Sequence, residues 1–202
     1  DKRYIGNAVR VFFRDGKATE RVSIDYPIGH RRRRAEGIPV LQAKFERAVA
    51  AYLPTGQARR LVQLCADAAR WGHGLASLGL KCGDRVLLFL DDTPAYPAAF
   101  FGAVRAGLVP LLINTLTPPD LLQFYLSDSV ASVAVTEAEF CPRFNTEACR
   151  DTRLCTLIVV NGQVRDHAAP QAIAVDPWLS RFTGDLAAAD THRNEMAFWM
   201  YS

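Results

Sequence analysis

The chain has 202 residues, of which 50% are hydrophobic and 22% are charged, so it can bury a sizeable core without metals or disulfides. Lys and Arg number 24 against 21 Asp and Glu, and the resulting net charge of +3 is too mild to indicate a nucleic-acid partner. The longest apolar stretches, such as Leu108–Ile113, are far too short to span a membrane, and the first residues lack the apolar core of a signal peptide.

The cysteines are odd in number and form no C-x-x-C pair, which argues against a zinc ribbon and against a disulfide framework. We therefore expect reduced thiols, several of them in the core, and a cytoplasmic location. The five are Cys65, Cys82, Cys141, Cys149 and Cys155.

The first part of the chain predicts a β-hairpin followed by a helix. Residues 8–13 and 20–26 are strand-like and flank Asp15-Gly16, a strong hairpin signal. The arginine run 31–34 could contact phosphates or an acidic membrane, but no further basic or aromatic residues extend it, so we favour a solvated loop. Residues 39–53 have helical spacing and end before Pro54.

A regular alternation begins at Gln57. Residues 57–79 predict a long amphipathic helix with an apolar face, closed by Gly79. Residues 85–90 form a short apolar run that suits a strand covered on both faces. Thr93 or Asp92 is the candidate N-cap of the next helix, residues 95–107, whose small residues allow close packing on a sheet.

The same pattern continues to the end of the chain. Helices separated by short apolar strands predict repeated βαβ units, hence an α/β fold with a mostly parallel sheet and helices on both faces. The remaining predicted strands are 108–113, 131–136, 154–160 and 196–201, and the remaining helices are 121–129, a short one in 137–144 and 176–182.

Few residues point to chemistry by type and spacing. His73 has no carboxylate or nucleophile near it in sequence, and His192 lies in a charged loop that is expected to be solvated. Asp91 and Asp92 follow a strand and could hold a metal, but helix capping is the plainer interpretation, and no metal site is predicted. No glycine-rich phosphate cradle occurs, so spacing alone indicates no reaction.

Three stretches nevertheless resemble one enzyme family. GDRVLLFL (83–90), AFFGAVRAGLVPLLINT (99–115) and DTHRNEMAFWMYS (190–202) are similar to the amino-terminal segment of adenylate-forming (AMP-binding) acyl-CoA synthetases, most closely the aryl-CoA ligases of the benzoate-CoA ligase type. The resemblance covers residues 57–202 and, more loosely, 9–26. It implies two parts: an amino-terminal hairpin with an unmatched basic and helical segment in 1–56, and an α/β subdomain of the AMP-binding domain in 57–202.

In that family the strand corresponding to 196–201 leads into a loop that wraps the ATP phosphates. The resemblance therefore implies that Tyr201 and Ser202 form the stem of a nucleotide-binding loop, and it implies no catalytic residue within these 202 positions. The implied substrates are a carboxylic acid such as benzoate, ATP with Mg²⁺, and coenzyme A. The chain is then an amino-terminal fragment that is inactive alone. The acid and the acceptor stay open.

Two alternatives remain. The chain could be a non-catalytic α/β interaction module that self-associates through uncovered apolar surface. It could also be an independent nucleotide-binding domain, which ranks last because no glycine follows the strand 85–90. Residues 30–52 match nothing in the family, which indicates an insertion or the scar of a rearrangement.

Overall fold

A computed structural model describes residues 6–162, 164, 170–184 and 186–201. The chain divides into two compact units, residues 1–60 (unit 1) and residues 61–202 (unit 2), each of which is described by itself. Helix α2 (Thr55–Ser77) begins in unit 1 and continues into unit 2.

Unit 1 contains a hairpin and a helix. Strands β1 (Asn7–Val9) and β2 (Val22–Ile24) pair in antiparallel fashion, and Gly16 has φ 84° in the turn between them, so the predicted hairpin is confirmed with shorter strands. The predicted loop at the arginine run is wrong. Residues Arg31–Arg33 form a 3₁₀ turn, η1, that leads directly into helix α1 (Arg34–Tyr52).

The arginine run is helical because its side chains find local partners. The Arg33 guanidinium contacts the Glu36 carboxylate at 2.6 Å and donates to the Tyr26 carbonyl oxygen. Arg32 donates to the Tyr26 hydroxyl at 2.7 Å, and the His30 side chain accepts from the Arg32 N–H at the turn's N-terminus. For part of the arginine run, these contacts take the place of hydrogen bonds to water. Helix α1 therefore begins five residues before its predicted start at residue 39.

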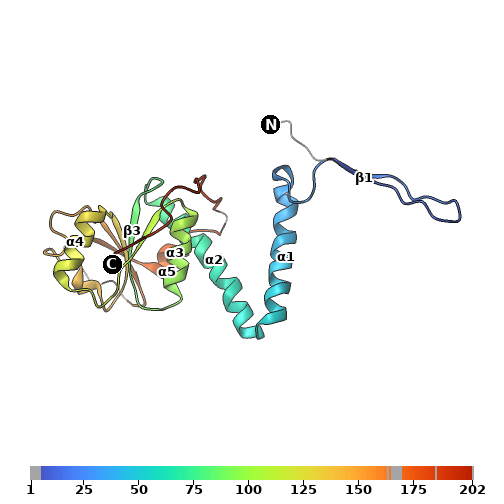
Figure 1. Cartoon of the computed structure of the whole chain (residues 1–202). Helices are drawn as coiled ribbons and strands as arrows, with labels where there is room; N and C mark the ends of the chain where they lie inside the picture. The colour runs from blue at the N-terminus through green and yellow to red at the C-terminus, as the bar shows by residue number, and fades with distance from the viewer. Residues whose placement is uncertain (1–5, 163, 165–169, 185, 202) are drawn as a thin grey trace. The chain divides into compact units, whose positions relative to one another are not determined.

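Unit 2 is built on a six-stranded sheet in the order β7-β6-β5-β3-β4-β8, in which every described pair of neighbours is parallel (Figure 1). The mostly parallel α/β sheet is therefore confirmed. The strands are β3 (Arg85–Phe89), β4 (Val109–Leu112), β5 (Val133–Glu137), β6 (Thr156–Val160), β7 (Gln171–Ala174) and β8 (Trp199–Met200).

Helices cover both faces of this sheet. Helix α3 (Ala95–Arg105), helix α5 (Val175–Leu179) and the part of α2 in unit 2 pack on one face, against the inward side chains that include Val86, Leu88 and Ile158. Helix α4 (Pro119–Ser129) and the 3₁₀ turn η2 (Cys141–Arg143) pack on the other (Figure 1). Alternate residues of each strand therefore point into two hydrophobic cores, one on each face of the sheet. This explains the continuous apolar runs in the sequence.

Helices α2 and α3 touch through two glycines. A Cβ added at Gly102 would lie 2.6 Å from the Trp71 Cβ and 2.8 Å from the Ala68 carbonyl oxygen, and one added at Gly72 would lie 2.8 Å from the Gly102 carbonyl oxygen. The helix backbones therefore approach more closely than any larger residue permits, as the small residues of α3 predicted.

Several details differ from the sequence prediction. Helix α3 is capped by neither Thr93 nor Asp92: its N-cap is Pro94, and no side chain bonds there. Strand β7 was not predicted, because its four residues lack a distinctive alternation. Of the five thiols, all free, only Cys141 is buried, so the expectation of several core cysteines is wrong. Among the described residues, no helix combines the length and apolarity needed to cross a bilayer.

Candidate functional site

The candidate site lies at the carboxyl edge of the unit 2 sheet, where the parallel strands all end. The chain passes from β3 to β4 on one side and later returns to β5 on the other, so the strand order reverses beside β3. Ligands of open α/β sheets bind outside the carboxyl ends of the strands, next to such a reversal. The segments that follow β3, β4, β5 and β8 therefore define the region to inspect.

The final strand delivers Tyr201 to this edge. Strand β8 pairs in parallel with β4, Trp199 opposite Leu111 and Met200 opposite Leu112, so Tyr201 emerges beside the end of β4. The predicted strand 196–201 is real but shortened to two residues, and it occupies a sheet edge with β4 as its neighbour. Ser202, the other predicted site residue, lies outside the described residues.

Tyr201 is held by stacking and by one hydrogen bond. Its ring stacks on Tyr125 of α4, with centroids 4.1 Å apart and planes 22° apart, and lies 5.3 Å from the ring of Trp199. Its hydroxyl donates to the Asp128 carboxylate at 2.8 Å. Burial, and then this bond to a negative carboxylate, raise the pKa of the Tyr201 phenol above its usual value. Tyr201 thus fixes the direction in which the chain leaves β8.

The loop after β4 is tied to neighbouring segments. Arg143 of η2 donates to the carbonyl oxygens of Thr115 and Thr117, and its guanidinium lies 5.1 Å from the ring centroid of Phe89. The Thr115 hydroxyl donates to the Asp91 carboxylate at 2.7 Å. Because Arg143 follows β5 and Asp91 follows β3, three strand ends are joined by this one loop.

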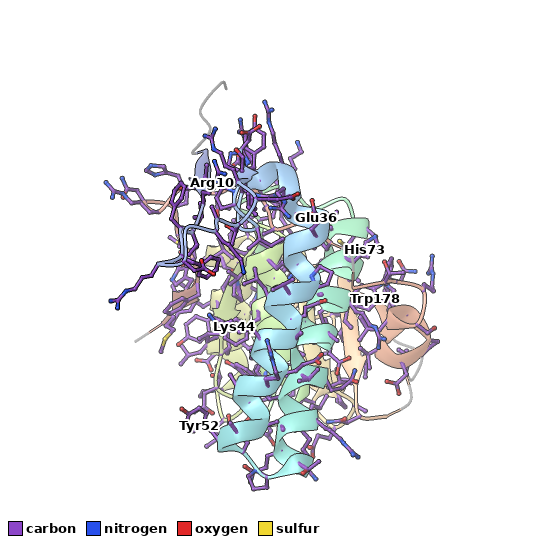
Figure 2. All side chains as sticks on the ribbon, turned by 90° about the vertical axis from the view of Figure 1, so that its right-hand side faces the viewer. Arg10, Glu36, Lys44, Tyr52, His73 and Trp178 are labelled. Atoms are coloured by element: carbon purple, nitrogen blue, oxygen red, sulfur yellow. The ribbon has the colours of Figure 1, made fainter. Side chains whose placement is uncertain are left out.

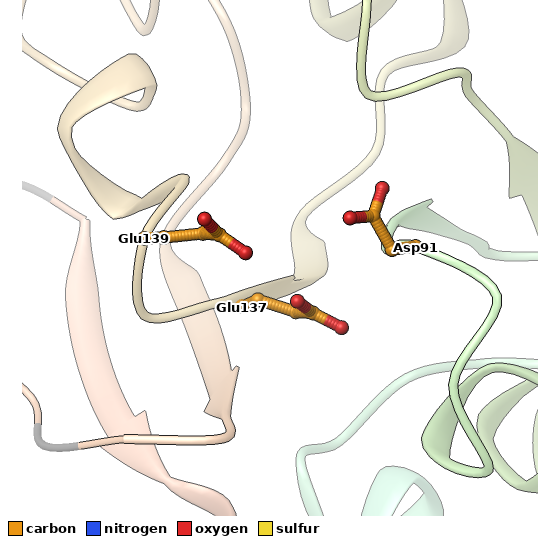
Figure 3. A group of neighbouring side chains, drawn as sticks. All are labelled: Asp91, Glu137 and Glu139. Atoms are coloured by element: carbon orange, nitrogen blue, oxygen red, sulfur yellow. The ribbon is translucent and has the colours of Figure 1, made fainter.

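Three carboxylates gather at the strand reversal (Figure 3). Asp91 follows β3, Glu137 ends β5, and Glu139 lies two residues further; one oxygen from each lies within 4.8 Å of the others. Glu137 is only 5% exposed, and burial, with added repulsion from Asp91 and Glu139, raises the pKa of its carboxyl group. Asn161 donates to Glu137 at 3.3 Å. Sequence reasoning missed this cluster, because Asp91 lies more than forty positions before Glu137 and Glu139.

Carboxylate oxygens are ligands that divalent cations prefer. The cluster lies two strands away from β8 at Asp91 and three strands away at Glu137, which corresponds to about 10–15 Å across the sheet. It therefore does not coincide with the position of Tyr201, and we assign no Mg²⁺ to it.

The two histidines singled out in the sequence lie elsewhere. His73 on α2 is half-buried, with Nδ1 3.2 Å from the Thr183 carbonyl oxygen and its ring 5.4 Å from that of Phe182; Figure 2 labels it beside Trp178. It is therefore held by packing and by a contact with the backbone. His192 is exposed: its Nδ1 accepts from the Asn194 N–H.

A cavity of about 1000 Å³ lies at the opposite, amino edge of the sheet. It opens between the starts of β3 and β4 and the segment before β8, and His192, Arg85 and Glu195 are among its lining residues. The carboxyl edge of the sheet, where ligand chemistry is expected, is therefore on the opposite side of the sheet from this cavity.

Comparison with known proteins identifies the larger part of the chain. A family model described as AMP-binding enzyme matches residues 43–202. The chain belongs to the AMP-binding enzyme family. The chain is similar to the 4-hydroxybenzoate--CoA/benzoate--CoA ligase of Rhodopseudomonas palustris, with 36% identity over 134 residues, covering 66% of this chain and 24% of the ligase. The benzoate--CoA ligase of Thauera aromatica is 33% identical over 141 residues, covering 70% of this chain and 24% of the ligase.

Solved structures agree with this family assignment. The anthranilate CoA ligase AuaEII, in complex with anthranoyl-AMP, has a TM-score of 0.61 and 28% identity, covering 69% of this chain and 25% of that chain. A benzoate CoA ligase from Burkholderia xenovorans LB400 has a TM-score of 0.57 and 30% identity, covering 68% and 26%. The chain spans about a quarter of the length of the AMP-binding ligases that it matches.

A second family matches the beginning of the chain. A model of the MmgE/PrpD C-terminal domain covers residues 1–68, overlapping the AMP-binding match over 43–68. The 2-methylcitrate dehydratase of Salmonella typhimurium is 49% identical over 70 residues, covering 35% of this chain and 14% of that enzyme. The mitochondrial enzyme of Yarrowia lipolytica is 47% identical over 62 residues, covering 31% and 12%.

This second match corrects one expectation and explains another. The loose resemblance of residues 9–26 to AMP-binding enzymes is not what the comparison finds, because the AMP-binding match begins at residue 43. Residues 30–52, which were expected to match nothing in the AMP-binding family, lie wholly within the part that resembles the dehydratases; for residues 43–52 that expectation is wrong, because they also lie in the AMP-binding match. No signal in the sequence alone pointed to this second family.

Proposed function

We propose that the chain supplies the amino-terminal part of an ATP-dependent carboxylate–CoA ligase. In that reaction the carboxylate of the acid attacks the α-phosphate of ATP, pyrophosphate leaves, and the thiol of coenzyme A then displaces AMP from the acyl-adenylate. An aromatic acid such as benzoate is the proposed substrate. The similarity of the chain to ligases named for benzoate and 4-hydroxybenzoate supports this choice.

One observation carries the proposal: β8 lies parallel to β4 and brings Tyr201 to the carboxyl edge of the sheet. We propose Tyr201 and Ser202 as the stem of the loop that holds the ATP phosphates. Backbone N–H groups and hydroxyls of such a loop can stabilise negative charge on the α-phosphate. The stacking of Tyr201 on Tyr125 and its bond to Asp128 would keep this stem in one orientation.

The proposal gives these 202 residues a supporting role and no catalytic residue. When bound with ATP, Mg²⁺ neutralises phosphate charge. The chain's own contribution is to fix the sheet edge, through Tyr201 and through the loop that Arg143 and Asp91 tie down. Alone, the chain is then inactive. Reduced thiols and the use of ATP and coenzyme A fit a cytoplasmic location.

Two assays of ATP–pyrophosphate exchange with benzoate test the proposal. The 202-residue chain alone should give no exchange, and robust exchange would refute its supporting role. Residues 57–202 should also replace the corresponding segment of the Thauera aromatica benzoate--CoA ligase with exchange retained. A chimera that folds, as judged by circular dichroism and a monodisperse elution profile, but gives no exchange would overturn the ligase assignment.

We further propose that the chain joins pieces of two enzyme families, with residues 1–56 as the hairpin and helical part and 57–202 as the AMP-binding part. Support comes from the overlap of the two family matches at residues 43–68. The similarity of PIGHRRR (27–33) and PTGQARR (54–60) fits a junction near Pro54. Sequencing the gene and its flanking DNA from an independent isolate tests this: a different arrangement there would overturn it.

A non-catalytic interaction module is the second candidate. It is favoured by apolar side chains exposed along and before β8, namely Met196, Phe198 and Met200. Such a surface favours self-association. Sedimentation velocity at several concentrations discriminates the two, because a monomer at all concentrations would argue against an interaction module of this kind.

A further inference from the structure

Unit 1 presents apolar side chains to solvent instead of burying them. Among its described residues, 6–60, only Gly37, Val49 and Ala58 are buried. Phe12 is 72% exposed and Tyr52, labelled near the end of α1 in Figure 2, is 87% exposed. The other exposed large apolar residues of the unit are Val9, Val11, Phe13, Val22, Ile24, Ile28, Ile38, Val40, Leu41 and Phe45.

The hairpin shows the lack of a core most clearly. Its paired strands are three residues long, and every residue in them is exposed. A two-stranded hairpin is marginally stable in water and needs a further strand or a helix packed on one face. Exposed valines, isoleucines and phenylalanines along both of its arms are what a face made for packing contains.

The same features continue onto α1. Ile38, Leu41 and Phe45 lie at positions i, i+3 and i+7 of this helix, hence on one face, and all three are exposed. An apolar stripe on one face of a helix normally packs against another element. One internal contact of unit 1 is well defined: a Cβ at Gly37 would lie 2.5 Å from the Ile28 carbonyl oxygen, so α1 and the segment after the hairpin are fitted to one another.

The comparisons indicate what covers such a segment. Residues 1–68 match the MmgE/PrpD C-terminal domain, and the matched part makes up 12–14% of the 2-methylcitrate dehydratases. With 47–49% identity, the segment is similar enough to keep its pattern of apolar positions. In those enzymes the remaining protein is available to bury it, whereas residues 69–202 of this chain lie in the AMP-binding match.

We propose that the hairpin and α1 of unit 1 form a docking surface for one kind of partner: a 2-methylcitrate dehydratase-type protein whose own matching segment is displaced or missing. The unit would take the place of that segment, and its exposed apolar side chains would enter the core that the segment normally completes. This proposal rests on the two-family origin proposed above and is independent of nucleotide binding by unit 2.

Direct binding tests the proposal. The full 202-residue chain is immobilised by a tag at its carboxyl end, and two analytes are compared: the Salmonella typhimurium dehydratase lacking the 70-residue segment that this chain matches, and the intact enzyme. We expect binding to the shortened enzyme and at least about tenfold weaker binding to the intact one, in which the site is filled. Equal or absent binding to both folded proteins overturns the proposal.

Matched variants locate the surface. Val22→Asp with Ile24→Asp places charges on exposed positions of β2 and should weaken binding at least about tenfold, because a buried unpaired charge is costly. Phe101→Asp places a charge on an exposed position of α3 in unit 2. It should leave binding to the dehydratase unaltered. Equal effects of the two variants would contradict the assignment to unit 1.

A second measurement serves if the shortened dehydratase does not fold. The intact dehydratase is refolded from urea with the 202-residue chain in excess, and we expect the two proteins to co-elute. The chain that carries Val22→Asp with Ile24→Asp should not co-elute with the dehydratase. Failure of the unaltered chain to co-elute overturns the proposal.

The same protein preparations also test two other possible partners of the unit 1 surface, a second copy of the chain and an anionic lipid surface. Unit 1 carries fourteen Lys and Arg against six Asp and Glu, a net charge of +8, whereas residues 61–202 carry ten against fifteen. Concentration-dependent self-association that Val22→Asp with Ile24→Asp abolishes, without dehydratase binding, would identify a second copy instead. Binding to phosphatidylglycerol vesicles, without dehydratase binding, would identify an anionic lipid surface. Either result overturns the proposal.

Discussion

The contact between Tyr201 and Asp128 should determine how firmly β8 is held against β4. Replacing Tyr201 by Phe keeps the stacking on Tyr125 but removes the hydroxyl that donates to Asp128 at 2.8 Å. A hydrogen bond to a charged acceptor contributes about 1.5–3 kcal/mol when protected, and exposure of Asp128 reduces this toward about 1 kcal/mol. Local opening of β8 should then become about fivefold more frequent.

Hydrogen–deuterium exchange of a peptide covering β8 measures this opening directly. Tyr201→Phe and Asp128→Ala should each speed exchange in this peptide, and the double variant should be little faster than either, because both substitutions remove the same hydrogen bond. Tyr52→Phe is the matched control, since Tyr52 is 87% exposed and lies outside unit 2. Exchange in β8 that stays unchanged in Tyr201→Phe would refute the reasoning.

The pH dependence follows from the same contact. The pKa of Tyr201 is raised in the folded chain, chiefly by burial and then by Asp128, whereas an unfolded tyrosine ionises near pH ~10. The stabilisation is therefore fully present below pH ~10 and is lost as the pH rises through the folded pKa. β8 should open more readily in strongly alkaline solution, and this change should be absent in Tyr201→Phe.

Three further predictions concern the packing and the candidate site. Gly102→Ala should lower the free energy of unfolding by about 1–2 kcal/mol in urea, since the new Cβ meets the α2 backbone, whereas Gly56→Ala, with open space around it, should not; equal stability would contradict the close helix contact. Arg143→Ala should speed hydrogen exchange in residues 114–118, because two carbonyl oxygens lose their donor, and unchanged exchange would show that the loop is held otherwise. Because the pKa of Glu137 is raised in the folded chain, its contribution to stability is present at acidic pH and lost toward neutral pH. In urea unfolding, Glu137→Gln should therefore be more stable than the parent at pH 7, and this advantage should vanish near pH 4. A variant less stable than the parent at pH 7 would mean that the hydrogen bond from Asn161 to the Glu137 carboxylate outweighs the cost of burying that charge.

Much of the unit 2 fold could be predicted from the sequence because its four central strands, β3 to β6, are buried on both faces. A run such as Val86–Leu90 has no polar position that would suggest another structure, and Gly107 marks the end of α3 clearly. The βαβ alternation then implies parallel pairing. Strand β7 was missed because Gln171–Ala174 is short and only partly buried.

The candidate site was predicted less completely, because its members meet only through topology. Asp91 was noted as an acidic residue at the end of a strand, but its partner Glu137 ends β5, and Glu139 follows β5, a strand that pairs with β3 although β4 comes between them in the sequence. Tyr201 was placed at the carboxyl edge by its family resemblance, whereas its bond to Asp128 required the structure. The packing of unit 1 could be predicted least from the sequence, because its exposed apolar residues follow no simple burial pattern.

Residues Leu111 and Trp199 pair directly although 88 positions separate them in the sequence. Contacts between such distant positions form late, because a long loop must close first. During synthesis, β4 therefore leaves the ribosome long before its outer neighbour exists. For that interval its free N–H and C=O groups can pair with a strand from another nascent chain. Yield in cells should accordingly depend on translation rate and on chaperones that shield this transient edge.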